Sequence, residues 1–166
     1  MSFCCCPFPL FYAPYKRRVP QPIPPSPLLN NGMQVQLIGT GNTTVLNNAN
    51  VIFNTILTNL SPNIVYNNVT GVFTVLKAGV YIIDWWVNAD GAEEETTIYF
   101  VIETSTGTSI GASSPSPVTT IQLKGEALVY LPENATFTLV NRTGAPVNYG
   151  TSQIQADLRV VKVNTI

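Results

Sequence analysis

The sequence predicts an all-β domain that follows an extended, proline-rich N-terminal arm. From Leu28 onward, short runs of β-branched and aromatic residues alternate with turns rich in Asn, Gly, Pro and Ser, which is typical of β-sandwiches and barrels. No stretch long enough for a helix keeps a helical apolar period free of Gly or Pro. Eight of the thirteen prolines fall within residues 1–27, and proline lacks the N–H that a helix or a central strand requires.

The apolar runs predict about nine or ten strands joined by short turns. Strands are expected at residues 34–38, 51–53, 64–66, 73–76, 80–88, 97–103, 119–130, 136–141 and 153–163. Gly125 is expected to bend the strand at 119–130. Turn signals separate the strands, among them Asp90-Gly91 and the Ser-Pro-Ser-Pro stretch at 114–117.

The most apolar strand, residues 80–87, reads Val-Tyr-Ile-Ile-Asp-Trp-Trp-Val and is bulky on both faces. A strand of this kind is covered on both sides. In a two-layer sandwich only one face meets the opposite sheet, so the other face needs a further partner. A second copy of the chain is the simplest candidate. We expect four residues at the subunit core or interface: Tyr81, Ile83, Trp85 and Trp86.

Around this strand the sequence resembles a known family of folds. Residues 68–87 contain Gly71-x-Phe73 and then Gly79-x-Tyr81, followed by alternating bulky residues. This pattern resembles the core signature of the complement-head/tumour-necrosis-factor-like jelly rolls. The resemblance implies a jelly-roll β-sandwich that assembles as a homotrimer. Asp84 is then either a buried, hydrogen-bonded core residue or a residue that lines the trimer axis.

Residues 120–131 and 135–144 are similar to the bacterial branch of this family, which includes the C-terminal domains of Bacillus collagen-like exosporium glycoproteins. The match covers about residues 33–163. The sequence departs from those proteins because it has no Gly-X-Y collagen run. A stalkless head with a cysteine-bearing N-terminal connector resembles the subunits of endospore appendage fibres, in which such connectors link one subunit layer to the next.

The arm divides into a connector or anchor at residues 1–19 and a proline-rich neck at 20–32, before the head domain at 33–166. Residues 20–27 predict polyproline II, a stiff spacer of about 25 Å at ~3.1 Å per residue. The connector is either a free, sticky tail or a segment that docks on another surface. Docking is favoured because disordered tails are poor in aromatic residues. The docking candidates are the large apolar residues Phe3, Phe8, Leu10, Phe11, Tyr12 and Tyr15.

All three cysteines, Cys4, Cys5 and Cys6, are consecutive and lie near the start of the arm. Adjacent cysteines pair with each other only under strain, and three in a row lack the spacing of a zinc site. They either remain reduced or form intermolecular disulfides that cross-link or anchor the chain. Their odd number favours the intermolecular bonds.

Composition argues against several classes of function. Only 10% of residues are charged, against roughly 25% in an average protein, which favours an apolar oligomer interface. The net charge of −1 gives no basis for nucleic-acid binding. The chain has no His, so it lacks the commonest general base and zinc ligand. We therefore predict that the protein is not an enzyme and uses no cofactor.

No apolar run approaches the ~20 residues that span a membrane. The basic cluster at 16–18 follows the apolar N-terminal segment, the reverse of the order in a standard signal peptide. We expect an extracellular or spore-surface protein without a recognisable signal peptide.

Residues 93–95 are three consecutive glutamates. They form either a calcium site or a solvated loop. Calcium needs several converging oxygens at alternating positions, so the loop is favoured and no metal site is predicted.

Two main hypotheses of function follow. The first is a structural subunit of an extracellular fibre on a spore, with trimeric heads joined head-to-tail by the arm and attached to a spore-surface anchor protein. The second is a trimeric, surface-anchored head that binds a glycan or receptor, with Tyr66 and Tyr149 as candidates for an exposed aromatic pocket. A third, a phage or virion decoration protein, would share the trimer and the arm.

Overall fold

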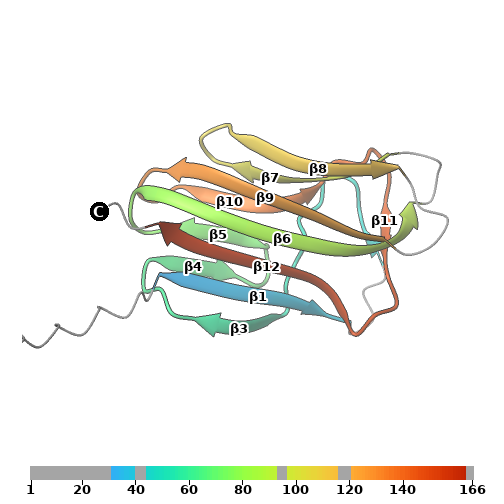
Figure 1. The fold of residues 1–166 in the computed structure, drawn as a ribbon, viewed down its shortest axis with the longest axis horizontal. Coiled ribbons are helices and arrows are strands. Elements are labelled where there is room, and N and C mark those ends of the chain that lie inside the picture. The colour runs from blue at the N-terminus through green and yellow to red at the C-terminus, as the bar shows by residue number, and fades with distance from the viewer. Residues whose placement is uncertain (1–30, 40–43, 93–96, 116–120, 164–166) are drawn as a thin grey trace, which may run out of the picture.

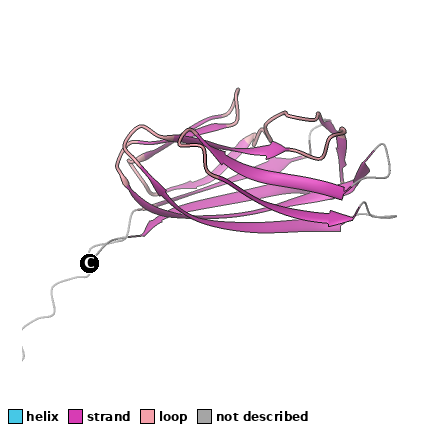
Figure 2. Cartoon of the chain, turned by 90° about the horizontal axis from the view of Figure 1, so that it is seen from above, coloured by secondary structure: helices cyan, strands magenta, loops and turns pink. Residues whose placement is uncertain are grey.

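The computed structural model describes residues 31–39, 44–92, 97–115 and 121–163. The predicted connector, nearly all of the neck, the three cysteines and the glutamates at 93–95 lie outside these residues. The described chain forms two antiparallel sheets with no helix among its elements (Figure 1). Turning the molecule by 90° shows the strands of the sandwich and the loops that join them (Figure 2).

The first sheet has seven strands. Their order is β2 (Thr44–Val45), β11 (Val147–Tyr149), β6 (Gly79–Ala92), β12 (Ile154–Val163), β1 (Gly32–Ile38) and β3 (Thr55–Asn59), and β9 (Ile121–Leu131) also pairs with β6. The second sheet has five strands, in the order β4 (Ile64–Asn67), β5 (Val72–Val75), β10 (Thr136–Asn141), β7 (Thr97–Thr104) and β8 (Ser109–Pro115). The all-β jelly-roll prediction is confirmed by this architecture.

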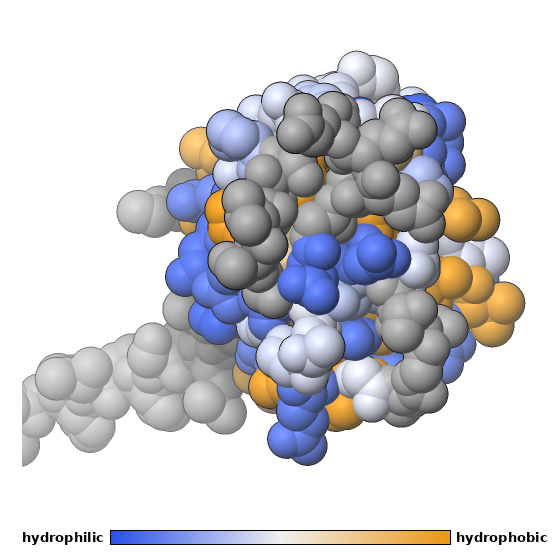
Figure 3. Space-filling model, turned by 90° about the vertical axis from the view of Figure 1, so that its right-hand side faces the viewer, coloured by the Kyte–Doolittle hydropathy of each residue, from blue (hydrophilic) through white to orange (hydrophobic). Residues whose placement is uncertain are grey.

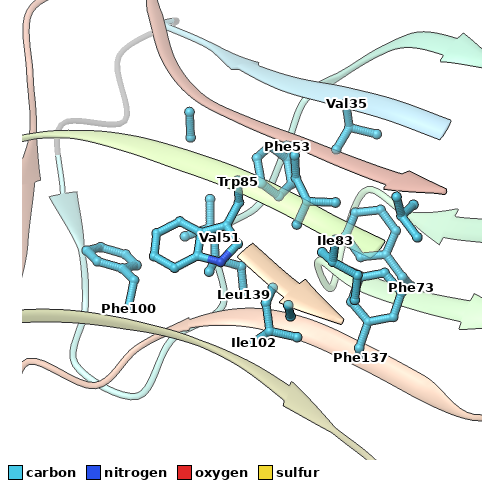
Figure 4. Packing of buried hydrophobic residues seen from close by; sticks show 14 of the residues in the cluster. Val35, Val51, Phe53, Phe73, Ile83, Trp85, Phe100, Ile102, Phe137 and Leu139 are labelled. Atoms are coloured by element: carbon cyan, nitrogen blue, oxygen red, sulfur yellow. The ribbon is translucent and has the colours of Figure 1, made fainter. Parts of the chain in front are cut away.

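The core lies between the sheets and is rich in aromatic side chains (Figure 4). Phe73 stacks on Phe137 with ring centroids 4.7 Å apart, and Phe53 meets Tyr66 edge-on at 6.2 Å. The Tyr66 hydroxyl accepts a hydrogen bond from the Phe53 N–H at 2.7 Å and donates to the Phe53 carbonyl at 3.0 Å. The side chain of Tyr66 thus satisfies backbone groups that no neighbouring strand reaches.

Packing explains the identity of the four residues of the family pattern, Gly71, Phe73, Gly79 and Tyr81. Gly71 has a φ of 73°, and a side chain there would place its Cβ 2.8 Å from the Val51 carbonyl. Phe73 and Tyr81 are fully buried. Gly79 lies against the side chain of Lys162, which occupies the space that a Cβ would take.

Gly125 does not interrupt the pairing of its strand. The ladder between β6 and β9 runs without a register shift from Gly79↔Leu131 to Ala89↔Ile121. Gly125 pairs with Trp85, and a Cβ at Gly125 would lie 2.4 Å from the indole. The glycine therefore makes room for the Trp85 ring inside the core.

The strand predictions need several corrections. The described residues form twelve strands, more than predicted, because β2, β3, β8 and β11 were missed. Residues 51–53 form no strand: Val51 and Phe53 are buried by packing, and the only ladder contact there is a single bridge from Asn50 to Val140. The predicted turn at Asp90-Gly91 is instead part of β6.

Candidate self-association surface

The outward face of the first sheet carries an apolar patch at one end. Residues directly opposite each other on antiparallel strands share a face. Across β9, β6 and β12 such residues make two rows of three apolar side chains. Tyr130, Val80 and Val163 make the first row, and Leu128, Ile82 and Val161 make the second. Leu128 and Tyr130 are 66% and 62% exposed. We call these six residues the apolar patch.

The apolar patch lies at the end of the sheet where the described chain begins and ends. Gly32, the first residue of β1, pairs with Val161, and Val163 is the last residue of β12. Figure 1 shows the arrowhead of β12 and the start of β1 at this end of the sandwich. Residues 1–30 therefore join the head beside the apolar patch.

Next to the apolar patch the same face becomes polar and charged. Glu126, Asp84 and Arg159 form the third row across β9, β6 and β12, and Lys124, Trp86 and Asp157 form the fourth. These two rows line a shallow depression of about 390 Å³. The two rows combine acidic and basic side chains, with Glu126 and Asp84 next to Arg159 in one row and Lys124 and Asp157 on either side of Trp86 in the other. A facing surface with the complementary charges would fit them.

Asp157 is the buried member of this polar region, with 2% exposure. Its Oδ2 accepts hydrogen bonds from the Nε2 atoms of Gln34 and Gln36, each at 2.8 Å. Its Oδ1 lies 3.3 Å from Nε of Arg159. The buried carboxylate is therefore fully supplied with donors from its own chain.

The structure separates the four interface candidates. Tyr81, Ile83 and Trp85 point into the core and are 0%, 0% and 3% exposed, so they offer no side-chain surface to a second copy. Trp86 points outward and is half-buried. Asp84 is exposed on the same outward face, which contradicts the alternative that placed it in the core.

The exposed members of the apolar patch were missed, although a signal was present. In β9 the inward residues Leu123, Ala127, Val129 and Leu131 alternate with outward ones. The outward positions begin as Gln122, Lys124 and Glu126 and then change to Leu128 and Tyr130. A break from polar to apolar on the outward face of an amphipathic strand indicates a covered surface.

The tyrosines proposed for an exposed pocket are mostly buried. Tyr66 lies in the core, and burial raises its pKa to about 12 despite its hydrogen bonds to Phe53. Burial likewise raises the pKa of Tyr149 well above its usual range. Tyr149 is 7% exposed, and it lines a small groove at the far end of the sandwich.

That far end is the one turned toward the viewer in Figure 3. Its centre is hydrophilic, with hydrophobic side chains gathered toward the margins of the view. Within the described part of the chain, no group of three His, Cys, Asp or Glu side chains is placed to hold a metal ion. No helix there is long and apolar enough to cross a membrane.

No family model and no curated protein matches the sequence. Solved structures match the fold at low identity. The globular domain of the zebrafish complement 1qA protein is 16% identical with a TM-score of 0.65, over 82% of this chain and 99% of that one. Eiger TNF from S. frugiperda is 14% identical with a TM-score of 0.62, over 82% and 95%.

Vertex protein P5 of PRD1 is also similar, at 14% identity and a TM-score of 0.56, over 82% of this chain and 99% of that one. None of these three is described as an enzyme or as a spore protein. The exosporium and appendage resemblance therefore stays a prediction. The whole described head, with its sheet order and its signature glycines, has the jelly-roll fold of the complement 1q and tumour necrosis factor domains.

Proposed function

We propose that this protein is a homotrimeric structural subunit of an extracellular fibre or appendage, on the surface of a spore. The observation that carries the proposal is the apolar patch, in which Leu128, Tyr130, Val161 and Val163 are 39–66% exposed on one sheet face. A contiguous cluster of exposed apolar side chains marks a contact surface. In a homotrimer, the partner that covers the apolar patch is a second copy of the chain.

The energetics fit an assembly built from several contacts. Full burial of a large apolar side chain contributes roughly 1.5–3 kcal/mol, and these four are already about half buried, so covering the rest contributes about 3–6 kcal/mol in total. Association costs an estimated 4–15 kcal/mol in lost freedom of motion. One patch alone is therefore a marginal contact, whereas a closed ring of three copies has three contacts and the charged rows beside them.

The connector at residues 1–19 then joins one trimer to the next. Its aromatic residues dock on a neighbouring head, and Cys4, Cys5 and Cys6 form disulfides between copies or to an anchor protein. Three arms per trimer bind together, which raises the effective affinity of the joint. A head-to-tail contact of this kind does not close on itself, so it propagates into a filament.

A trimeric, surface-anchored binding head is the second candidate. The depression beside Trp86 has a volume of about 390 Å³, which falls within the ~300–1,000 Å³ range of small-molecule pockets. This reading requires the depression to stay open in the assembled protein. In the structural-subunit proposal, a second copy of the chain covers this depression.

Electron microscopy of negatively stained protein separates the two. Full-length protein is compared with a version that lacks residues 1–29, each with and without reductant. Thin filaments from the full-length chain, and single trimers from the truncation, are the expected result. Isolated trimers from both would overturn the fibre proposal and favour the anchored binding head. Filaments that survive reductant would assign the joint to the aromatic residues and not to the cysteines.

A further inference from the structure

A small apolar groove lies at the end of the sandwich opposite Asn31. Its lining comes from the end of β1, from β2 and β11, and from the chain that follows β2. The apolar lining residues are Leu37, Val45, Leu46, Ala49, Ile52 and Tyr149. We call this hollow the terminal groove.

The volume of the terminal groove is about 190 Å³. An apolar cavity of about 150 Å³ holds a benzene molecule, and pockets for small-molecule ligands begin near 300 Å³. The terminal groove therefore has room for about one aromatic ring. It suits a side chain inserted from another segment better than a free ligand.

The polar residues of the terminal groove already have partners within the chain. The Thr44 hydroxyl donates to Oδ1 of Asn148 at 2.8 Å, and the Asn50 side-chain amide donates to the Thr70 carbonyl at 2.8 Å. An occupant therefore meets mainly carbon, with the ring of Tyr149 on one side. This chemistry selects an apolar or aromatic side chain.

The rim of the terminal groove is held in place. Leu46 is 63% exposed, yet it begins a turn closed by the hydrogen bond from the Ala49 N–H to the Leu46 carbonyl at 3.1 Å. Asn48 adopts a φ of 62° in that turn, and its N–H donates to the Asn141 carbonyl at 2.8 Å. A rim fixed in this way loses little freedom when an occupant binds.

The path of β1 relates the terminal groove to the N-terminal arm. β1 enters the sheet at Gly32 and runs toward the groove, which it reaches at Leu37. Thirty residues precede Asn31 and join the head at the opposite end. When two heads are stacked end to end, the arm of one starts opposite the groove of the other.

We propose that the terminal groove receives an aromatic side chain from residues 1–15 of the next copy in the filament. This inference rests on the proposed fibre function and names the surface at which its joint forms. The chain supplies the matching chemistry: Phe3, Phe8, Phe11, Tyr12 and Tyr15. Docking on its own head would require the arm to reverse direction through the proline-rich neck, which the predicted stiffness of residues 20–27 opposes.

Photo-cross-linking in the full-length chain tests the proposal. Leu46 is replaced by photoreactive benzoylphenylalanine, which its exposed position accommodates. Protein labelled with heavy nitrogen and carrying the probe is mixed with unlabelled protein without it, then assembled and irradiated. Mass spectrometry identifies the cross-linked peptides. The matched control carries the probe at Val65, which is 49% exposed on the outward face of the second sheet.

The expected result is a cross-link from position 46 to residues 1–15 of an unlabelled copy, on the order of tenfold above the Val65 control, because a docked segment has a high local concentration. Cross-links only within one copy would overturn docking on the next copy. Filaments without any cross-link to residues 1–15 would overturn the groove assignment and leave the fibre proposal standing. Cross-links between copies in protein that forms no filaments would overturn the fibre proposal and leave the groove assignment standing.

Discussion

The outward faces of the two sheets differ in how well their central apolar residues are covered. On the second sheet, Val101 and Val140 are paired and only 1% and 3% exposed although they point away from the core. On the first sheet, Leu128 and Tyr130 are more than half exposed. The two faces belong to the same short chain and meet the same solvent, so their difference needs a cause.

The second sheet covers the Val101–Val140 pair with its own side chains, although Val65 and Tyr99 on the same face stay 49% and 36% exposed. Arg142 forms a two-pronged ion pair with Glu103, and the strand register places Val101 and Val140 between those two residues. The Tyr99 ring leans over Gly111 beside Val101. The first sheet has no such cover over Leu128 among the described residues, since the row beyond it is exposed as well. The second face therefore exposes apolar side chains singly, whereas the first exposes a contiguous cluster of them, the kind of surface that marks a contact.

The largest expected effect comes from placing a charge in the apolar patch. Leu128→Asp should weaken association of the heads by about a hundredfold or more, because a carboxylate would have to leave water at the contact. Light scattering coupled to size-exclusion chromatography, over a range of protein concentrations, measures the change. The fold itself should survive, since an exposed side chain is replaced.

The matched control is Val65→Asp on the outward face of the second sheet, where the native side chain is also about half exposed. It should leave the assembly state unchanged. Equal effects of the two substitutions would show that the apolar patch is not the interface. Loss of the circular-dichroism signal of β-structure in either variant would point to misfolding in place of dissociation.

Strands could be predicted from the sequence wherever a run of apolar residues also pairs with a neighbouring strand. Residues 136–141 were predicted as the strand that the structure contains, and Ile64–Asn67 was one residue longer than predicted. The missed β8, Ser109–Pro115, lies on a sheet edge and is built mainly from Ser, Gly and Ala, with Ile110 as its one large aliphatic residue. There hydrogen bonds and not burial define the strand. Residues 51–53 were wrongly predicted as a strand because Val51 and Phe53 are buried although they belong to no ladder; the Val51 N–H makes a single hydrogen bond to the Leu139 carbonyl.

The proposed contact surface could be predicted from the sequence only in outline. The doubly bulky pattern at 80–87 correctly indicated that an outward face carries large residues, such as Ile82 and Trp86. It could not show which neighbours share that face, because Leu128 and Val161 come from strands far away in sequence and meet Ile82 only through the sheet register. Cross-strand register is set by the whole fold and not by local pattern.

An effect of intermediate size on the free energy of unfolding is expected at Asp157, whose carboxylate accepts hydrogen bonds from its own chain in the polar part of the first face. Asp157→Ala removes the acceptor of two amide donors and a guanidinium, and should lower the free energy of unfolding by about 1–3 kcal/mol. Urea denaturation at a fixed protein concentration measures it. Asp84→Ala is the control, because Asp84 is exposed on the adjacent strand of the same face and its loss should change stability little. Similar losses from both would mean that the hydrogen bonds to Asp157 contribute nothing beyond general surface charge.

The smallest effect is expected on the second face, at the Glu103–Arg142 pair. The hydrogen bond from Arg142 lowers the pKa of Glu103 below its ordinary value, so the pair stabilises the fold above that value and the contribution is lost as the pH falls. Glu103→Gln should lower the melting temperature at pH 7 by about one or two degrees, since exposed ion pairs contribute little.

The same comparison over a series of falling pH values should show the difference shrink below the ordinary pKa of a glutamate and vanish only once the pH lies below the lowered pKa of Glu103 in the folded chain. Assembly should be unaffected at neutral pH, because the pair covers its own valines and takes no part in the proposed contact. A shift in assembly state from Glu103→Gln as large as that from Leu128→Asp would instead mean that both faces meet partners, and the asymmetry between them would no longer explain how the heads associate.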